Sequence, residues 1–174
     1  QSAPAVLLMA HYDSVPGSPG AADDAAGVAA ILESLRAFKA GGGRPARDVV
    51  ALFTDGEEKG LHGARLYFSR PATVETTGVV LNLEARGAAG RTYLFETGPG
   101  NADLVDLYRR VAPSPSGSSL ARFVYDRMPN FTDFTVSKRR GLPGLNFAFI
   151  GDEAAYHTRL ATPARLDRGS LQHM

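Results

Sequence analysis

The chain of 174 residues contains no cysteine, which excludes disulfide bonds and thiolate metal sites but is compatible with an oxidising or a reducing compartment. No apolar run is long enough to span a membrane, and no signal or lipidation motif occurs, so we expect no membrane contact from this segment. Neither sign of charge is in excess, because the 19 Lys and Arg residues nearly balance the 18 Asp and Glu residues. This balance argues against nucleic acid as a partner.

The remaining composition, 44% hydrophobic and 21% charged, is that of an ordinary globular protein. The length suits one core, so we predict a single domain over residues 1–174. The sequence opens without Met directly before an apolar segment, and its last residues, "ARLDRGSLQHM", are typical of a helix that is just beginning. We therefore expect a domain cut at both ends, with room for an export signal or membrane anchor outside it.

Short apolar segments alternate with segments of helical periodicity along the chain. Val6 to Ala10 is a continuous apolar run typical of a strand buried on both faces, and apolar residues recur at helical spacing from Ala25 until "GGGRP". Further strands are expected at residues 49–53, 79–83, 92–96, 123–125 and 145–150, and further helices at 61–69, 102–111 and 133–138. The alternation predicts an α/β fold, a three-layer αβα sandwich around a mostly parallel mixed sheet.

Histidines and carboxylates stand directly after these strands or before the helices that follow them. In open α/β sheets the carboxyl ends of the strands meet at one edge, where ligands bind. We therefore expect these side chains to converge in space. The set comprises His11, Asp13, Asp23, Asp24, Glu57, Glu58, Glu84 and His157.

Imidazole and carboxylate ligands without thiolate suit zinc in a catalytic site, where one position stays open for water. His11, Asp23 and Glu84 could hold one ion. Asp23, Glu58 and His157 could hold a second, with the Asp23 carboxylate bridging the two. Two ions roughly 3.5–4 Å apart can act together on a carbonyl group and a water molecule.

The remaining acidic residues receive separate roles in this interpretation. Glu57 is the expected general base. Asp13 is suited to accept the second ring N–H of His11 and so fix its tautomer. Asp24 is expected to cap the helix that follows it. Each motif also has a simpler explanation, such as a helix cap or a solvated acidic turn, and only the joint occurrence at one sheet edge favours a metal site.

Five segments carry a resemblance to a known family: "HYDS", "GAADDAAGV", "DGEEKGLHGA", "NLEARGAAG" and "AYHT". In order and approximate spacing the chain resembles the M28 zinc peptidases, and especially the branch of endoplasmic reticulum metallopeptidases and vacuolar membrane proteases. The resemblance implies a zinc exopeptidase-like fold with two zinc ions per chain. It also implies a peptide substrate with a free N-terminus, from which the enzyme removes N-terminal residues.

The roles that the resemblance implies agree with those assigned from the residues. It implies that Asp13 orients His11 and that Glu57 is the base. The zinc ligands that it implies are His11, Asp23, Glu58, Glu84 and His157. The chain departs from the family in lacking strands before the first motif and a full helix after the last. We name Phe131, Phe134 and Tyr156 as candidates for lining the specificity pocket.

Two alternatives remain open. Glutaminyl cyclases resemble the same fold and carry a similar "DGEE" turn, but use one zinc for an acyl transfer within the substrate. The transferrin receptor ectodomain resembles these peptidases yet is an inactive interaction domain, and it has lost ligands that are retained here. The abundance of Ala, Gly and Arg favours a bacterial source, and the relatives suggest an extracytoplasmic location, whether periplasmic, secreted or anchored facing outward.

Overall fold

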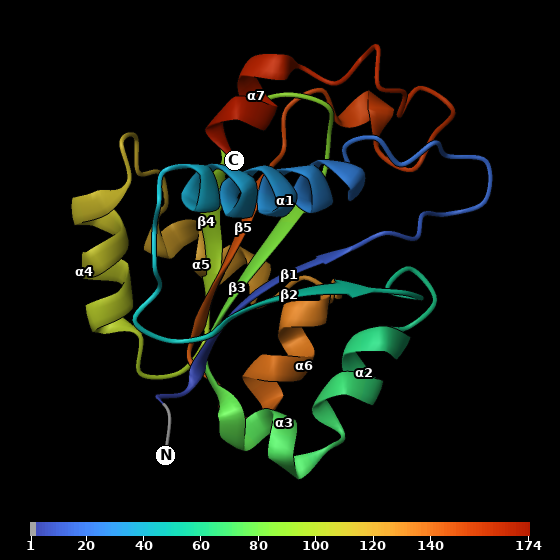
Figure 1. Ribbon diagram of the computed structural model, residues 1–174. Coiled ribbons are helices and arrows are strands. Elements are labelled where there is room, and N and C mark those ends of the chain that lie inside the picture. The colour runs from blue at the N-terminus through green and yellow to red at the C-terminus, as the bar shows by residue number, and fades with distance from the viewer. Residues whose placement is uncertain (1–2) are drawn as a thin grey trace.

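The computed structural model describes residues 3–174 (Figure 1). Within this range, five strands form one sheet in the order β2-β1-β3-β5-β4. All neighbouring strands are parallel except β4, which runs antiparallel to β5. The prediction of a mostly parallel mixed sheet is therefore confirmed. The strands are β1 (Ala5–His11), β2 (Val49–Thr54), β3 (Thr77–Ala85), β4 (Tyr93–Thr97) and β5 (Gly144–Phe149).

Helices cover both faces of this sheet and give the predicted three layers. Figure 1 shows α1 and α7 on one side of the sheet and α2, α3 and α6 on the other. The helices are α1 (Ala25–Ala40), α2 (His62–Phe68), α3 (Pro71–Thr76), α4 (Ala102–Val111), α5 (Ser119–Tyr125), α6 (Asp133–Arg139) and α7 (Arg168–His173), with a 3₁₀ turn, η1 (Glu153–Ala155). No helix within residues 3–174 is long and apolar enough to cross a membrane.

Alternating side chains of the strands supply the cores on the two faces. Leu7 and Met9 of β1 are fully buried and pack with Phe68 of α2 and Phe134 of α6. On the opposite face, Phe149 of β5 packs with residues of α1 and α7. Leu145 and Phe147 belong to a third cluster, which includes Leu104 and Tyr108 of α4.

The strand predicted at residues 123–125 is wrong, because this segment lies in α5. The alternation of Phe123 and Tyr125 favoured a strand, but Leu120, Phe123 and Val124 also fit helical spacing. Ser118 begins the helix by accepting a hydrogen bond from the N–H of Ala121 at 3.1 Å. Tyr125 then packs its ring edge-on against Phe95 of β4, with the ring centroids 4.7 Å apart.

The C-terminal residues form a helix, α7, as "ARLDRGSLQHM" indicated, and His173 is part of it. The Nδ1 atom of His173 accepts a hydrogen bond from the N–H of Thr92 at 3.2 Å. Leu171 and Met174 pack against buried side chains of α1 and β5. Helix α3, which begins with Pro71 in its first turn, was not predicted.

The chain order of the strands determines where a ligand can bind. From β1 the chain passes through α1 to β2 on one side, and then returns to β3 on the other side of β1. The loops after β1 and β3 therefore diverge and leave a crevice beyond the carboxyl ends of these strands. His11 ends β1 and Glu84 stands near the end of β3, so both lie at this crevice.

Candidate active site

His11 is the last residue of β1 and is buried, with 1% of its surface exposed. Its Nε2 lies 3.0 Å from Oδ1 of Asp23 and 3.6 Å from Oε2 of Glu84. Its Nδ1 lies 2.9 Å from the backbone carbonyl oxygen of Asp13 and 3.6 Å from the carboxylate of the same residue. Thus the main-chain oxygen of Asp13, rather than its side chain as expected, is the partner that fixes the ring of His11.

The carboxylate of Asp13 instead binds the loop after β2. Its two oxygens accept hydrogen bonds from the backbone N–H groups of Glu57 at 3.1 Å and Glu58 at 3.2 Å. Asp13 therefore holds together two segments that are 44 residues apart in the chain. This contact places the acidic pair beside His11.

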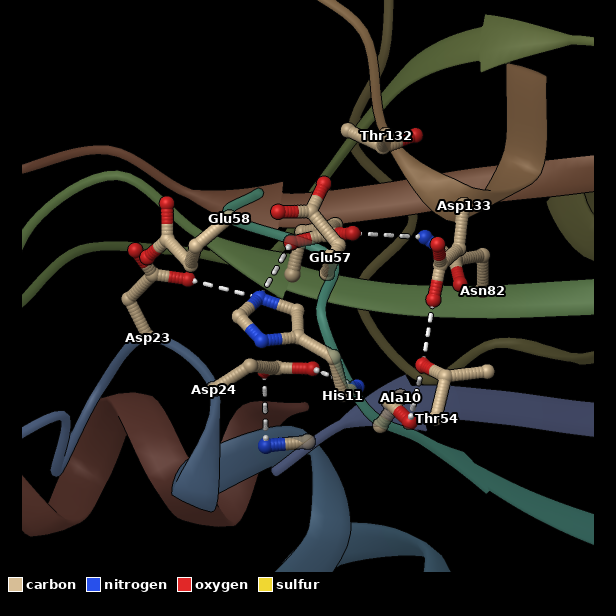
Figure 2. Close-up of polar contacts among 12 residues, drawn as sticks. Ala10, His11, Asp23, Asp24, Thr54, Glu57, Glu58, Asn82, Thr132 and Asp133 are labelled. Carbon is tan, nitrogen blue, oxygen red and sulfur yellow. Dashed lines mark hydrogen bonds and ion pairs between the residues drawn. The ribbon is translucent and has the colours of Figure 1, made fainter. Parts of the chain in front are cut away.

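Asp23 and Asp24, joined by a cis peptide bond, have different partners. Asp24 accepts hydrogen bonds from the backbone N–H of His11 at 3.2 Å and of Gly27 at 3.1 Å, so it caps α1 as predicted. Figure 2 shows Asp24 on the backbone side of His11, while the ring of His11 points toward Asp23. Asp23 is thereby left free to face the crevice.

His157 approaches Asp23 from the opposite end of the chain. Its Nε2 lies 2.9 Å from Oδ2 of Asp23 and 3.0 Å from Oε1 of Glu58. The ring stacks on Tyr156 with a centroid separation of 3.7 Å. The backbone of His157 adopts φ 57, an uncommon conformation for a residue other than glycine. The stacking and this backbone conformation together fix the direction of the imidazole.

The two histidines contact different oxygens of one buried aspartate, the arrangement expected of a carboxylate that bridges two cations. Ligand atoms of His11, Asp23 and Glu84 all lie within 4.8 Å of one another, and so do those of Asp23, Glu58 and His157. Oε1 of Glu58 is buried, and apart from Nε2 of His157 at 3.0 Å it has no polar partner. Buried carboxylates gathered in this way are costly unless protons or cations neutralise them. These imidazole and carboxylate groups therefore fit zinc.

The charges of the cluster shift the pKa values of its members. Burial and the negative charge of Glu84 raise the pKa of Glu57 to about 9, and burial and the charge of Asp23 raise that of Glu58 to about 7. Burial acts to lower the pKa of His11, but hydrogen bonds to Asp23 and Glu84 outweigh it and raise this pKa. The cluster thus binds protons where no cation neutralises it, and a divalent cation would displace them.

Sequence reasoning missed a second polar contact beside the site, between Asp133 of α6 and Thr54 of β2. Thr54 pairs with His11 across β1 and β2, and its hydroxyl group donates a hydrogen bond to Asp133. Burial raises the pKa of Asp133 to about 6. The signal available in the sequence was the acidic residue in "NFTDF", but nothing there links it to a strand 79 residues away.

Comparison with known proteins places this site in a family, because residues 1–174 match the model of Peptidase family M28. The chain belongs to peptidase family M28. The family that the motifs predicted is therefore confirmed. Membership in M28 supports a hydrolase that acts on peptides, with zinc as the implied metal.

Among curated relatives of this M28 chain, it is 36% identical over 171 residues to mouse (Mus musculus) endoplasmic reticulum metallopeptidase 1. It is 40% identical over 172 residues to the vacuolar membrane protease of Paracoccidioides lutzii. Each match covers 97% of this chain but only 19% and 17% of the respective relative. The chain therefore spans about a fifth of the length of these relatives, and the predicted branch of M28 is confirmed.

Solved structures show the same fold. A zinc aminopeptidase from Bacillus subtilis superposes with a TM-score of 0.78 at 25% identity, over 98% of this chain and 43% of that chain. A glutaminyl cyclase from an Acidobacteriales bacterium gives a TM-score of 0.73 at 17% identity, over 99% of this chain and 66% of that chain. The second likeness shows the fold alone, so it leaves the reaction undecided.

The expected location of the M28 chain, extracytoplasmic in a bacterium, is wrong by these comparisons. The curated relatives are eukaryotic proteins whose names refer to the endoplasmic reticulum and the vacuolar membrane. The bacterial source was expected from the abundance of Ala, Gly and Arg, and the extracytoplasmic location from the relatives. Composition alone does not determine the source of a protein.

A cavity of about 900 Å³ opens beside the candidate ligands of the M28 site. Besides the acidic residues, its lining includes the aromatic residues Phe95, Tyr125 and Phe131. Phe131 and Tyr156 therefore line the cavity, as expected of pocket residues. Phe134 does not, because it is fully buried in the core beneath the sheet.

Proposed function

We propose that this chain is the catalytic domain of a di-zinc aminopeptidase, spanning residues 1–174, which removes N-terminal residues from peptides. The observation that carries the proposal is the sharing of Asp23, whose two carboxylate oxygens face His11 and His157 separately. Glu57 lines the same cavity but belongs to neither group of candidate ligands. A shared ligand next to an unligated carboxylate is what a two-metal hydrolase requires.

In this proposal His11, Asp23 and Glu84 hold one zinc, and Asp23, Glu58 and His157 hold the other. Bound zinc would polarise the scissile carbonyl and lower the pKa of the attacking water.

Glu57 takes the proton from that water and later gives it to the leaving amine. In the metal-free protein, burial and the charge of Glu84 raise the pKa of Glu57 to about 9, so its carboxyl group holds a proton at neutral pH. The positive charge of bound zinc would lower this pKa and leave the carboxylate free to accept a proton. Asp13 keeps Glu57 in place through the backbone N–H, while its main-chain oxygen holds the ring of His11. One residue thus aligns the base with a candidate metal ligand.

The cavity favours a free N-terminus on the substrate. Its lining combines the carboxylates of Asp23, Glu57 and Glu58 with apolar and aromatic side chains, among them Phe95 and Phe131. An amine attracted to the carboxylates would leave the first side chain of the peptide against the apolar part of the lining. Only the first peptide bond would then reach Glu57.

Elemental analysis of the purified zinc-loaded protein, together with hydrolysis of leucine 4-nitroanilide, tests the proposal. We expect two zinc ions per chain, release of 4-nitroaniline from the free substrate, and little release from its N-acetylated form. The acetylated substrate is the matched control because it differs only at the amine.

The glutaminyl cyclase alternative makes the opposite prediction. One zinc per chain and conversion of N-terminal glutamine to pyroglutamate, without hydrolysis of leucine 4-nitroanilide, would reject the aminopeptidase. Two bound zinc ions without turnover of either substrate would favour the inactive interaction domain instead.

A further inference from the structure

A row of buried polar side chains crosses the sheet behind Glu84. Asn82 stands two residues before Glu84 on β3 and so projects from the same face of the sheet. In the register of the sheet, Asn82 pairs with Asn146 of β5, and Asn146 pairs with Glu96 of β4. Asn82 and Asn146 are fully buried and Glu96 is 3% exposed. We call these three residues, with Lys138 of α6, the polar row.

Asn82 makes the contact that links the polar row to the metal cluster. Its Nδ2 donates hydrogen bonds to Oε1 of Glu84 at 2.9 Å and to Oδ1 of Asn146 at 3.0 Å. Both hydrogens of the amide are therefore used, and a flipped amide would lose both bonds. Figure 2 shows one of these hydrogen bonds as a dashed line from the amide nitrogen of Asn82.

The remaining members of the polar row anchor Asn146. Its Nδ2 donates to Oε2 of Glu96 at 3.0 Å and to Oγ1 of Thr132 at 2.9 Å. Lys138 donates to the other carboxylate oxygen of Glu96 at 3.0 Å. The orientation of Asn146, and through it that of Asn82, is thus fixed by an ion pair about three strands from His11.

The two oxygens of Glu84 consequently have separate partners. Oε1 accepts from Asn82, whereas Oε2 lies 3.6 Å from Nε2 of His11, on the side of the candidate metal site. The terminal side-chain torsion of a glutamate has a broad distribution, so Glu84 by itself would not keep each carboxylate oxygen beside its own partner. The hydrogen bond from Asn82 supplies the missing restraint.

Asn82 is not an ideal residue for the stability of the core. Its Oδ1 is buried without a hydrogen-bond donor, and an unsatisfied acceptor of this kind costs free energy. Leucine at this position would remove that oxygen, but Oδ1 of Asn146 and Oε1 of Glu84 would then lose their donor. What asparagine adds, and leucine lacks, is the N–H that reaches Glu84.

We propose that Asn82 is a positioning residue, which holds Glu84 so that only Oε2 faces the first zinc site, and that Asn146 keeps the amide of Asn82 in the required orientation. This inference rests on the proposed function. Loss of such an outer partner typically weakens metal binding by about 10–100-fold. The first site should therefore bind zinc less tightly without Asn82, while the site of Glu58 and His157 should not change.

Zinc affinity, measured in competition with a chromophoric chelator, tests the inference on Asn82→Leu, Asn82→Ala and Asn146→Leu. Glu84→Ala identifies which of the two binding steps belongs to the first site. Asn101→Leu is the matched control: Asn101 is also buried and hydrogen-bonded to the backbone of β5, but it does not contact the polar row. Thermal unfolding of each metal-free variant measures the effect on the fold.

We expect the zinc dissociation constant of the first site, formed by His11, Asp23 and Glu84, to rise about 10–100-fold in the Asn82 variants and by less in Asn146→Leu. The dissociation constant of the other site should not change. Asn101→Leu should lower the unfolding temperature without altering either step. Equal zinc affinities in the Asn82 variants and in Asn101→Leu would overturn the inference while leaving the proposed function intact. A wild-type protein that binds no zinc would overturn the proposed function, and this inference with it.

Discussion

Adjacent residues of this chain perform distinct tasks because their side chains point to different elements. Asp24 binds backbone N–H groups at the end of β1 and the start of α1, whereas Asp23 faces two imidazoles. Glu57 and Glu58 divide in the same way: Glu58 lies against His157, and Glu57 belongs to neither group of candidate ligands. Each acidic pair therefore contains one candidate metal ligand and one residue outside the candidate ligand groups.

Replacement of Glu57 by glutamine separates catalysis from metal binding. Glutamine has the same shape but cannot accept the proton from the attacking water, so we expect kcat to fall by about 10²–10⁴-fold. Zinc content should remain at the wild-type value because Glu57 is outside both candidate ligand groups. Steady-state hydrolysis of leucine 4-nitroanilide and elemental analysis of the same sample measure the two quantities.

Glu75→Gln provides the control for this substitution. Glu75 is exposed on α3, far from the crevice, and its replacement removes the same charge. Its kcat should equal that of the wild-type enzyme. Unchanged kcat in Glu57→Gln would remove Glu57 from the mechanism. Loss of zinc from Glu57→Gln would instead make Glu57 a ligand.

Among the elements, the contact of β5 with its neighbours is unusually close at Gly144. Gly144 pairs with Val80 of β3, and a Cβ atom at this position would overlap the carbonyl oxygen of Val80 and approach the ring of Phe134 to 2.7 Å. The absence of a side chain therefore allows α6 to lie against the strand that carries Asn146.

Gly144→Ala should accordingly destabilise the protein by about 1–3 kcal/mol, because neither the backbone of β3 nor the buried ring can easily move. Gly41→Ala is the control: it has φ -76, and its added Cβ would meet no atom closer than 3.5 Å. We expect Gly41→Ala to change stability by less than about 0.5 kcal/mol. Chemical denaturation of the two metal-free variants compares them, and equal stabilities would contradict the tight contact.

The elements also show what sequence can and cannot predict. Helix α4 was predicted with its observed bounds, Ala102–Val111, because local periodicity determines them. The ligand candidates were found because each follows a strand, so that topology alone brings them together. The pairing of Asn82 with Asn146 was not found, since it depends on the register of strands 64 residues apart. The contact of Asp133 with Thr54 was missed because it depends on how α6 packs against β2, 79 residues away in the chain.

For the molecule as a whole, the candidate metal centre is the point where β1, the loop after β2, β3 and the C-terminal loop meet. The carboxylates concentrated there repel one another unless protons or cations neutralise them. Stability of the metal-free fold should thus depend on pH in a direction that can be derived from its pKa shifts.

Four groups of the centre have folded-state pKa values above their usual ones. The pKa of Glu57 rises from 4.5 to about 9 and that of Glu58 to about 7, chiefly through burial. Hydrogen bonds raise the pKa of His11 against the effect of burial, and a hydrogen bond to Asp23 raises that of His157. A raised folded-state pKa gives stability that is present below the unfolded-state pKa and lost as pH rises through the folded-state value. All four groups therefore act in the same direction.

Asp23 has a lowered pKa, since its hydrogen bonds to His11 and His157 outweigh burial. Its contribution is lost only as the pH falls below its usual value of 3.8, outside the window of the other groups. The metal-free protein should therefore unfold at lower temperature at about pH 9 than at about pH 5. The difference should reach several degrees, because 1 kcal/mol corresponds to roughly 2–4 °C in a domain of this size.

Zinc reverses this trend, because its ligands must lose protons before they bind it, so the rise in unfolding temperature on adding zinc should increase with pH. Thermal scans with and without chelator at several pH values measure both effects. Glu57→Gln serves as the internal control: it removes one raised pKa without removing a candidate ligand, so the metal-free slope should become shallower while the response to zinc persists. An unfolding temperature of the metal-free protein that is flat or rising between about pH 5 and pH 9 would show that the carboxylates are not held as closely as in this fold.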